Sequence, residues 1–218
     1  MIRFDRVPKP EGFDNAAQRG KEWLGSPPDA RAKKRPSCWL DLVPGSTTVR
    51  FRDKLAEGFR YLCGYSAMYV PNGQVDHFVS ETEDPLRLYD WENYRYADGW
   101  INASKKALPA NEVLDPFEVR DDWFEIILPS LQLVMTEAVP EELRDRARTM
   151  LDRMHLAHDE RVLRQRREWY RMYLEGELTS LEALAKKAPL IARAVAKQQR
   201  LDAAAPALTS NPHSEDHT

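Results

Sequence analysis

Three short stretches decide how this chain is expected to fold: Val75-Asp76-His77-Phe78, then Asp90-Trp91-Glu92-Asn93-Tyr94, then Asn102-Ala103-Ser104-Lys105-Lys106. They supply, in order, an Asp-His pair, a lone Asn, and an Asn three residues before a Lys. Hydrolysis of a phosphodiester needs an activated water, a cation that stabilises developing negative charge, and groups that hold the backbone. The ordered set predicts a metal-dependent nuclease.

Each stretch offers a different part of that chemistry. Successive strand residues point to opposite faces, so Asp76 and His77 need a strand end or a bulge to act on one scissile group. His77 suits the role of base, because the reference pKa of histidine lies near neutrality. Asn102 offers an amide oxygen that Mg²⁺ accepts. Lys105 shares a helical face with Asn102 and is expected to meet phosphate.

Periodicity and turn signals predict the elements around these stretches. They are a helix over 50–63, a hairpin over 66–79, a helix over 90–106, a second hairpin over 123–135, and helices from Pro140 to about 200. The first hairpin is expected to turn at Pro71-Asn72-Gly73. Asp90 is expected to cap the helix that follows it.

The resulting fold class is α+β, with a ββα core, an additional hairpin and a helical C-terminal extension. We expect a loop-rich segment over 1–50 that packs on the core, a catalytic domain over 51–136 and a helical extension over 137–201. The Ala-, Pro- and Ser-rich tail, 202–218, is expected to be disordered.

Composition favours a soluble cytoplasmic protein. The 218 residues have a mean hydropathy of −0.63 and are 31% charged, and no apolar run approaches the ~18–20 residues of a membrane span. The first residues lack the apolar core of a signal peptide. Two cysteines are too few for a disulfide framework and fit a reducing compartment.

Charge is distributed unevenly along the chain. Residues 1–60 hold 13 Lys/Arg against 8 Asp/Glu, residues 61–160 hold 9 against 20, and residues 161–200 hold 10 against 4. Carboxylates in the middle suit a metal site, and basic flanks suit phosphate contacts. Ordinary variation of a solvated surface would give the same pattern, and composition alone leaves both interpretations open.

The three stretches resemble the HNH (His-Me finger) endonuclease family, which has a ββα-metal motif. The resemblance implies His77 as general base, with Asp76 and Asn102 as ligands of Mg²⁺ or Mn²⁺. It implies that Asn93 braces the catalytic loop. Lys105, Lys106 and Arg95 are expected to contact phosphate or nucleic acid.

A small bacterial subset of that family is similar over roughly residues 55–130. The shared motifs are Cys63-Gly64-Tyr65, Asp76-His77-Phe78, Tyr89 to Arg95, Asn102-x-x-Lys105, Leu114-Asp115-Pro116-Phe117 and Trp123-Phe124. The resemblance implies DNA as substrate, with RNA not excluded. It also implies a place in bacterial anti-phage defence or restriction, beside an ATPase or another subunit.

One departure from the family concerns zinc. Many HNH proteins carry two Cys-x-x-Cys knuckles that bind structural zinc. Here Cys63 is followed by Ser66 at the first knuckle, and Asp98 and Ile101 stand at the second. We therefore predict no structural zinc, with apolar packing holding the motif together.

Other residues permit two interpretations. Arg161, Arg164, Arg167 and Arg171 recur on one face of an expected helix and could follow a nucleic-acid backbone or simply be solvated. His155 and His158 fit an exposed helix better than a metal site, and Asp115 fits a turn.

Two rival functions also remain. One is a nuclease-derived nucleic-acid or protein-binding module that is silent without a partner, and the other is a purely structural subunit. Loss of function on His77→Ala would separate the enzyme from the structural subunit.

Overall fold

The computed structural model describes residues 1–27, 34–106 and 108–204, and it confirms a mixed α+β fold. The helices and strands are α1 (Phe13–Gly25), α2 (Phe51–Gly58), β1 (Gln74–His77), β2 (Tyr94–Ala97), α3 (Gly99–Lys105), β3 (Phe124–Ile127), β4 (Gln132–Met135), α4 (Arg144–Arg153), α5 (Glu160–Leu174), α6 (Leu181–Ala185) and α7 (Pro189–Ala204). Short 3-10 helices lie at Cys38–Leu40, Pro85–Tyr89, Trp91–Asn93, Ala110–Glu112 and Glu141–Leu143.

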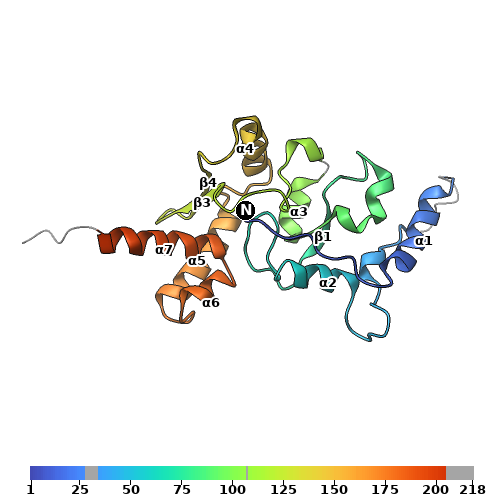
Figure 1. Cartoon of the computed structure of the whole chain (residues 1–218), viewed down its shortest axis with the longest axis horizontal. Coiled ribbons are helices and arrows are strands. Elements are labelled where there is room, and N and C mark those ends of the chain that lie inside the picture. Colours follow the sequence, from blue (N-terminus) through green and yellow to red (C-terminus); the bar gives the residue numbers. More distant parts are fainter. Residues whose placement is uncertain (28–33, 107, 205–218) are drawn as a thin grey trace, which may run out of the picture.

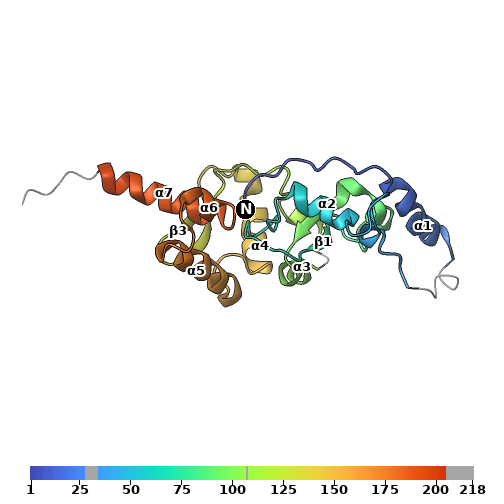
Figure 2. The same ribbon diagram turned by 90° about the horizontal axis from the view of Figure 1, so that it is seen from below.

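The molecule is elongated, with α1 toward one end and α7 toward the other (Figures 1 and 2). One half contains α1, α2, the β1–β2 sheet and α3. The other half contains β3, β4 and α5 to α7. The chain starts between the halves, where Phe4 donates its backbone N–H to Pro116. None of the helices in the described residues combines the length and apolar character that a membrane crossing needs.

Strands β1 and β2 form a two-stranded antiparallel sheet that leads into α3. The register places Asp76 opposite Arg95 and His77 opposite Tyr94. Asp98 begins α3, because its carboxylate accepts the N–H groups of Trp100 and Ile101. Gly99 is thus the first helical residue. The order β1, β2, α3 follows the expected ββα sequence of elements.

Two local predictions in this region were wrong. The expected hairpin over 66–79 does not form, because β1 pairs with β2 and residue 69 makes only an isolated bridge to residue 62. The expected helix over 90–106 is divided into a 3-10 turn, strand β2 and helix α3. All four residues of β2 are buried, so long-range pairing overrode local helical patterning.

The N-terminal segment contains a helix that the sequence did not reveal. Helix α1 buries Phe13, Ala17 and Gly20. The ring of Phe13 lies 5.0 Å from that of Trp91. A Cβ at Gly20 would fall 2.2 Å from the ring of Tyr89, so the contact requires glycine. Two glycines weaken the helical signal of this segment, which is why it was interpreted as loop.

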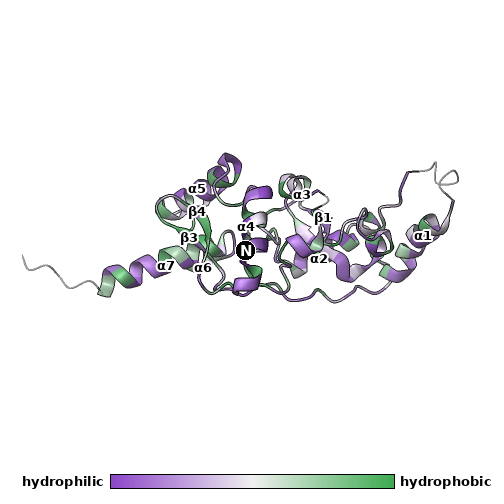
Figure 3. Cartoon of the chain, turned by 90° about the horizontal axis from the view of Figure 1, so that it is seen from above, coloured by the Kyte–Doolittle hydropathy of each residue, from purple (hydrophilic) through white to green (hydrophobic). Residues whose placement is uncertain are grey.

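The C-terminal half matches the sequence more closely. The expected second hairpin forms from β3 and β4. The chain beyond it is helical as predicted, with breaks near Gly176 and Pro189 and a further break between α4 and α5. Helix α7 packs against β3, and Figure 3 shows hydrophobic and hydrophilic residues mixed along this helix. It extends to Ala204, so residues 202–204 are helical; the rest of the predicted tail, 205–218, lies outside the described residues.

Candidate functional site

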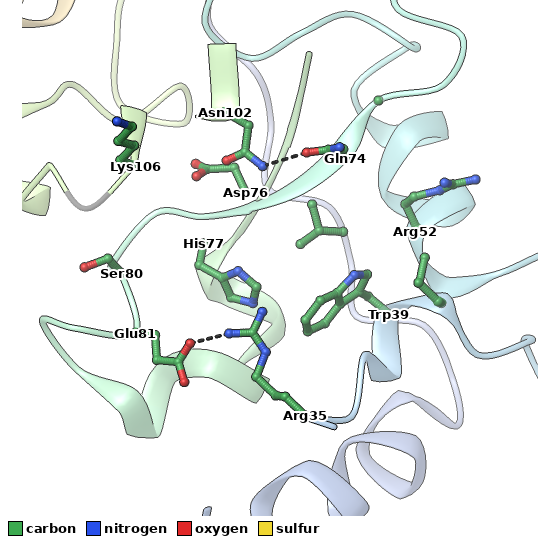
Figure 4. A pocket seen from close by; sticks show the side chains of 13 residues that line it. Arg35, Trp39, Arg52, Gln74, Asp76, His77, Ser80, Glu81, Asn102 and Lys106 are labelled. Carbon is green, nitrogen blue, oxygen red and sulfur yellow. Dashed lines mark hydrogen bonds and ion pairs between the residues drawn. The ribbon is translucent and has the colours of Figure 1, made fainter. Parts of the chain in front are cut away.

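A cleft of about 490 Å³ runs along strand β1. Residues 73–77 line it in succession, together with Asn102 and Lys106 from α3 and its end. The opposite wall comes from α2 and from the segment around Trp39 (Figure 4). Three of the four residues predicted for the catalytic and metal site, Asp76, His77 and Asn102, therefore meet in one cleft.

The cleft can reach both faces of β1 because it follows the edge of the strand. The register with β2 is regular, so Asp76 and His77 point to opposite faces, and His77 is the last residue of β1, so a strand end is present without a bulge. Figure 4 shows Asp76 and Asn102 on one side of the ribbon and His77 on the other. Within the described chain, β1 pairs only with β2, so a ligand at the other edge can contact side chains from both faces.

His77 is held in one tautomer by its surroundings. Its Nε2 lies 3.1 Å from the carbonyl oxygen of Leu88, which can only accept, so Nε2 carries the proton and Nδ1 retains a lone pair. The rings of Trp39 and Tyr94 contact the imidazole at centroid distances of 5.0 and 5.1 Å. Burial lowers the pKa of His77 to about 4, against the opposing effect of Asp76. The ring is therefore a neutral base at physiological pH.

The pKa gives the first prediction. The folded chain keeps His77 neutral down to about pH 4, whereas the unfolded chain protonates it near 6.5. The stability that depends on neutral His77 is then complete above pH 6.5 and is lost as the pH falls toward 4. A ¹H–¹⁵N NMR titration of the metal-free protein should show a His77 midpoint near 4 and an Nε2-protonated tautomer. A midpoint near 6.5 would contradict the buried placement.

Asn93 braces the loop between β1 and β2. Its Oδ1 accepts the N–H of Val79 at 2.8 Å, and its Nδ2 donates to the carbonyls of Val79 and Arg87 at 2.9 and 3.0 Å. The side chain is buried. Because Leu88 follows Arg87 directly, these bonds also position the carbonyl that orients His77. The bracing role inferred from the resemblance agrees with this geometry.

Asn93→Ala is expected to destabilise the protein by about 1–3 kcal/mol, because it leaves buried backbone groups of the loop without partners. Urea unfolding followed by circular dichroism would measure the change. Asn111→Ala is the matched control, since Asn111 is exposed and should shift stability by less than about 0.5 kcal/mol. Equal effects of the two substitutions would contradict the bracing role.

Asp76 is buried and already has two donors. Lys105 Nζ lies 3.0 Å from Oδ1, and the hydroxyl of Tyr65 lies 2.5 Å from Oδ2. The same ammonium donates to the carbonyls of His77 and Phe78 at 2.9 and 3.1 Å. Lys105 is fully buried, and its three donors are used. Lys105 is an ion-pair partner of Asp76 and does not line the cleft, so it does not make the phosphate contact expected of it.

The oxygen atoms at this end of the cleft suit a hard cation only in part. The Nδ2 of Asn102 donates to Gln74 at 3.1 Å, which directs the amide oxygen elsewhere. Each Asp76 oxygen can accept one bond beyond its present donor. Asp76 and Asn102 thus offer the ligand types that Mg²⁺ takes, although Lys105 compensates the one carboxylate.

Arg95 is likewise buried, and it does not line the cleft. It forms a two-bond ion pair with Asp115, with Nε to Oδ1 at 2.7 Å and Nη2 to Oδ2 at 2.5 Å. Its Nη1 donates to the carbonyls of Glu92 and Tyr94. The expected nucleic-acid contact of Arg95 is therefore replaced by a structural one. Asp115, interpreted from sequence as a turn residue, has this second role.

The cations that line the cleft come partly from unexpected places. Arg35 and Arg52 join Lys106 in the lining. Arg35 pairs with Glu81 beside His77, and its guanidinium lies 6.0 Å from the ring centroid of Trp39. Sequence reasoning missed Arg35, Trp39 and Arg52. The run of basic residues around Arg35 was the one available signal, and it was interpreted only as a loop.

The arginine row of α5 does not line the cleft. Arg164 and Arg167 pair with Glu160, and Arg171 pairs with Glu168 and Glu177. Arg161 lies over the ring of Trp100 at 5.0 Å. Arg166 is buried and donates to the carbonyls of residues 131, 156 and 157. Contact of the row with nucleic acid remains a prediction, and neighbouring glutamates already offset most of its charge.

The positions compared with the zinc knuckles of HNH proteins are Cys63, Ser66, Asp98 and Ile101. Burial raises the pKa of the Cys63 thiol, and the backbone N–H groups of Ser66 and Asp98 oppose that effect. Ser66 and Ile101 are buried. Within the part of the chain that the structure describes, no group of three or more His, Cys, Asp or Glu side chains could hold a metal ion.

Comparison with known proteins adds no family to this description. No model of a known protein family matches the chain. No curated protein matches it either.

Proposed function

We propose that this chain is a metal-dependent endonuclease of the HNH type, which hydrolyses phosphodiester bonds in DNA. The observation that carries the proposal is the environment of His77. Its Nε2–H is fixed on the Leu88 carbonyl, in a loop braced by Asn93, and its Nδ1 is left as a neutral base in a cleft shared with Asp76 and Asn102. The order of the elements, β1, β2 and α3, supports it as well.

The residues divide the reaction among them. The Nδ1 of His77 takes a proton from the attacking water, and the Leu88 carbonyl stabilises the imidazolium that results. Asp76 and Asn102 would hold Mg²⁺ or Mn²⁺, which stabilises negative charge on the phosphate and the leaving oxygen. Arg35, supported on Trp39, lies beside His77 where it can meet a phosphate oxygen.

The wider biological setting is proposed on the resemblance alone. We propose a cytoplasmic protein of a bacterial anti-phage or restriction system, with an ATPase or another subunit as partner. Two buried free cysteines, Cys38 and Cys63, are compatible with a reducing compartment.

The proposal is tested by incubating the purified chain with supercoiled plasmid and Mg²⁺ or Mn²⁺. Open-circular product should appear with either metal and should disappear when EDTA is added. Parallel reactions with single-stranded DNA and RNA distinguish the substrates. Intact DNA and RNA across all metals, with and without the neighbouring gene products, would contradict the proposal.

Lys106 is expected to contact the DNA backbone, because it lines the cleft, is exposed and has no ion-pair partner among the described residues. Lys106→Ala should weaken binding of every DNA sequence and lower the slope of log K against log salt by about 1. Fluorescence anisotropy at several salt concentrations measures both. Lys186→Ala, exposed on another part of the surface, is the control and should leave the slope unchanged.

A further inference from the structure

The carboxylate of Asp76 carries a charge that the protein itself already compensates. Its two oxygens accept from Lys105 Nζ at 3.0 Å and from the Tyr65 hydroxyl at 2.5 Å. Only 3% of Asp76 is exposed, and Lys105 is fully buried. The pair is therefore neutral as a unit, and a divalent cation approaching Asp76 would also approach a buried ammonium.

Lys105 cannot move aside without breaking other bonds. The ammonium also donates to the carbonyls of His77 and Phe78. These contacts fix the end of β1, where Asp76 and His77 lie. Releasing Asp76 to a metal would leave these carbonyls, or the ammonium itself, unsatisfied in a buried place. The contacts of Lys105 therefore hold its side chain beside Asp76.

Among the described residues, the rest of the cleft lining adds no unpaired carboxylate. Glu81 is the other carboxylate in the lining, and it pairs with Arg35. Of the three lining cations, Arg35 pairs with Glu81 and Arg52 pairs with Asp53, which leaves Lys106 as a lining cation with no ion-pair partner among the described residues. Such a cleft attracts phosphate and disfavours a bare dication.

We propose, on the basis of the function proposed above, that this site takes up its divalent metal only together with a substrate phosphate. Because Lys105 compensates the charge of Asp76, the phosphate supplies the negative charge that the metal ion requires. Mg²⁺ is commonly held by one or two carboxylates together with substrate phosphates, with water completing its coordination. Lys105 is then a positioning residue that makes metal binding conditional on substrate.

The test measures Mn²⁺ binding to the metal-free full chain by the EPR signal of free Mn²⁺. Titrations are run without and with saturating thymidine 3′,5′-bisphosphate, which has no internucleotide bond to cleave. The affinity of the nucleotide for Mn²⁺ alone is measured and subtracted. We expect Mn²⁺ affinity to rise about 10-fold or more with the nucleotide. By reciprocity, Mn²⁺ should tighten nucleotide binding by the same factor.

Three variants locate the effect. Asp76→Asn should lose the nucleotide-dependent Mn²⁺ binding. Lys105→Met should bind Mn²⁺ without the nucleotide and lose most of the coupling, whereas Lys105→Arg should keep it. Because Lys105→Met removes a buried charge, its folding is checked by circular dichroism, and the reciprocal titration of the unmodified chain tests the proposal without it.

The outcomes separate this inference from the proposed function. Equal Mn²⁺ affinity with and without the nucleotide, in a chain that cleaves plasmid, would overturn the inference and leave the nuclease intact. A chain that neither binds Mn²⁺ at Asp76 under any of these conditions nor cleaves would overturn both.

Discussion

His77→Ala is expected to lower the rate of DNA cleavage by roughly 10²–10⁴-fold, the usual contribution of a general base. Among the described residues that line the cleft, His77 supplies the one neutral nitrogen base, and its Nε2–H is fixed by the carbonyl of Leu88. Alanine removes the proton acceptor and leaves Asp76, Lys105 and Asn102 in place. Single-turnover cleavage of a labelled duplex, with metal and enzyme in excess, measures the chemical step directly.

The controls for this experiment distinguish chemistry from folding. His158→Ala removes an exposed histidine outside the cleft and should leave the rate unchanged. The Mn²⁺ binding of His77→Ala in the presence of thymidine 3′,5′-bisphosphate should stay within a few-fold of the unmodified chain. Circular dichroism should show that His77→Ala stays folded, and a folded variant that cleaves at the normal rate would remove His77 from the mechanism.

The parts of the site that could be predicted from sequence are those fixed by neighbours along the chain. Asp76 and His77 adjoin in β1, and Asn93 ends the loop that it braces. Asn102 follows the cap at Asp98 by one turn of helix. For these residues, order and spacing nearly determine the geometry. The motif therefore led to the cleft although the predicted elements around it were partly wrong.

The parts that could not be predicted depend on pairing across long sequence distances. Strand β1 pairs with β2 across a loop of sixteen residues, and the turn at 71–73 lies outside that pairing. A strong local turn signal therefore pointed to the wrong partner strand. Arg35 and Trp39 line the cleft because tertiary packing brings their segment against β1. Their spacing in the sequence does not predict this contact.

The prediction that differed most from the structure at the site concerned the burial of two charged side chains. Lys105 and Arg95 were expected to contact phosphate or nucleic acid, which would require exposed side chains. Each is buried with a carboxylate partner, Asp76 and Asp115 respectively. Sequence alone gives no indication that a Lys or Arg has a partner some twenty or more residues away.

Asp115→Ala is expected to destabilise the protein by about 3–5 kcal/mol, because it leaves the buried guanidinium of Arg95 without its counter-ion. The two groups are 3% and 6% exposed as side chains, and the pair makes two hydrogen bonds. The same carboxylate also accepts the N–H of Phe117 at 3.0 Å. Denaturant unfolding of the purified variant measures the loss.

Asp122→Ala supplies the comparison, because Asp122 pairs with Arg120 at the surface, where the side chains are 51% and 66% exposed. Such pairs contribute about 0–1 kcal/mol. If the two substitutions cost the same, the Arg95–Asp115 pair is not the buried bond described here. Arg95 would then again be available for nucleic acid, and Arg95→Ala should weaken DNA binding without loss of stability. The buried pair predicts instead that Arg95→Ala lowers stability, and that any loss of DNA binding follows from that. The guanidinium carbon of Arg95 lies 3.9 Å from the ring centroid of Phe117, so it cannot contact a phosphate unless the fold opens.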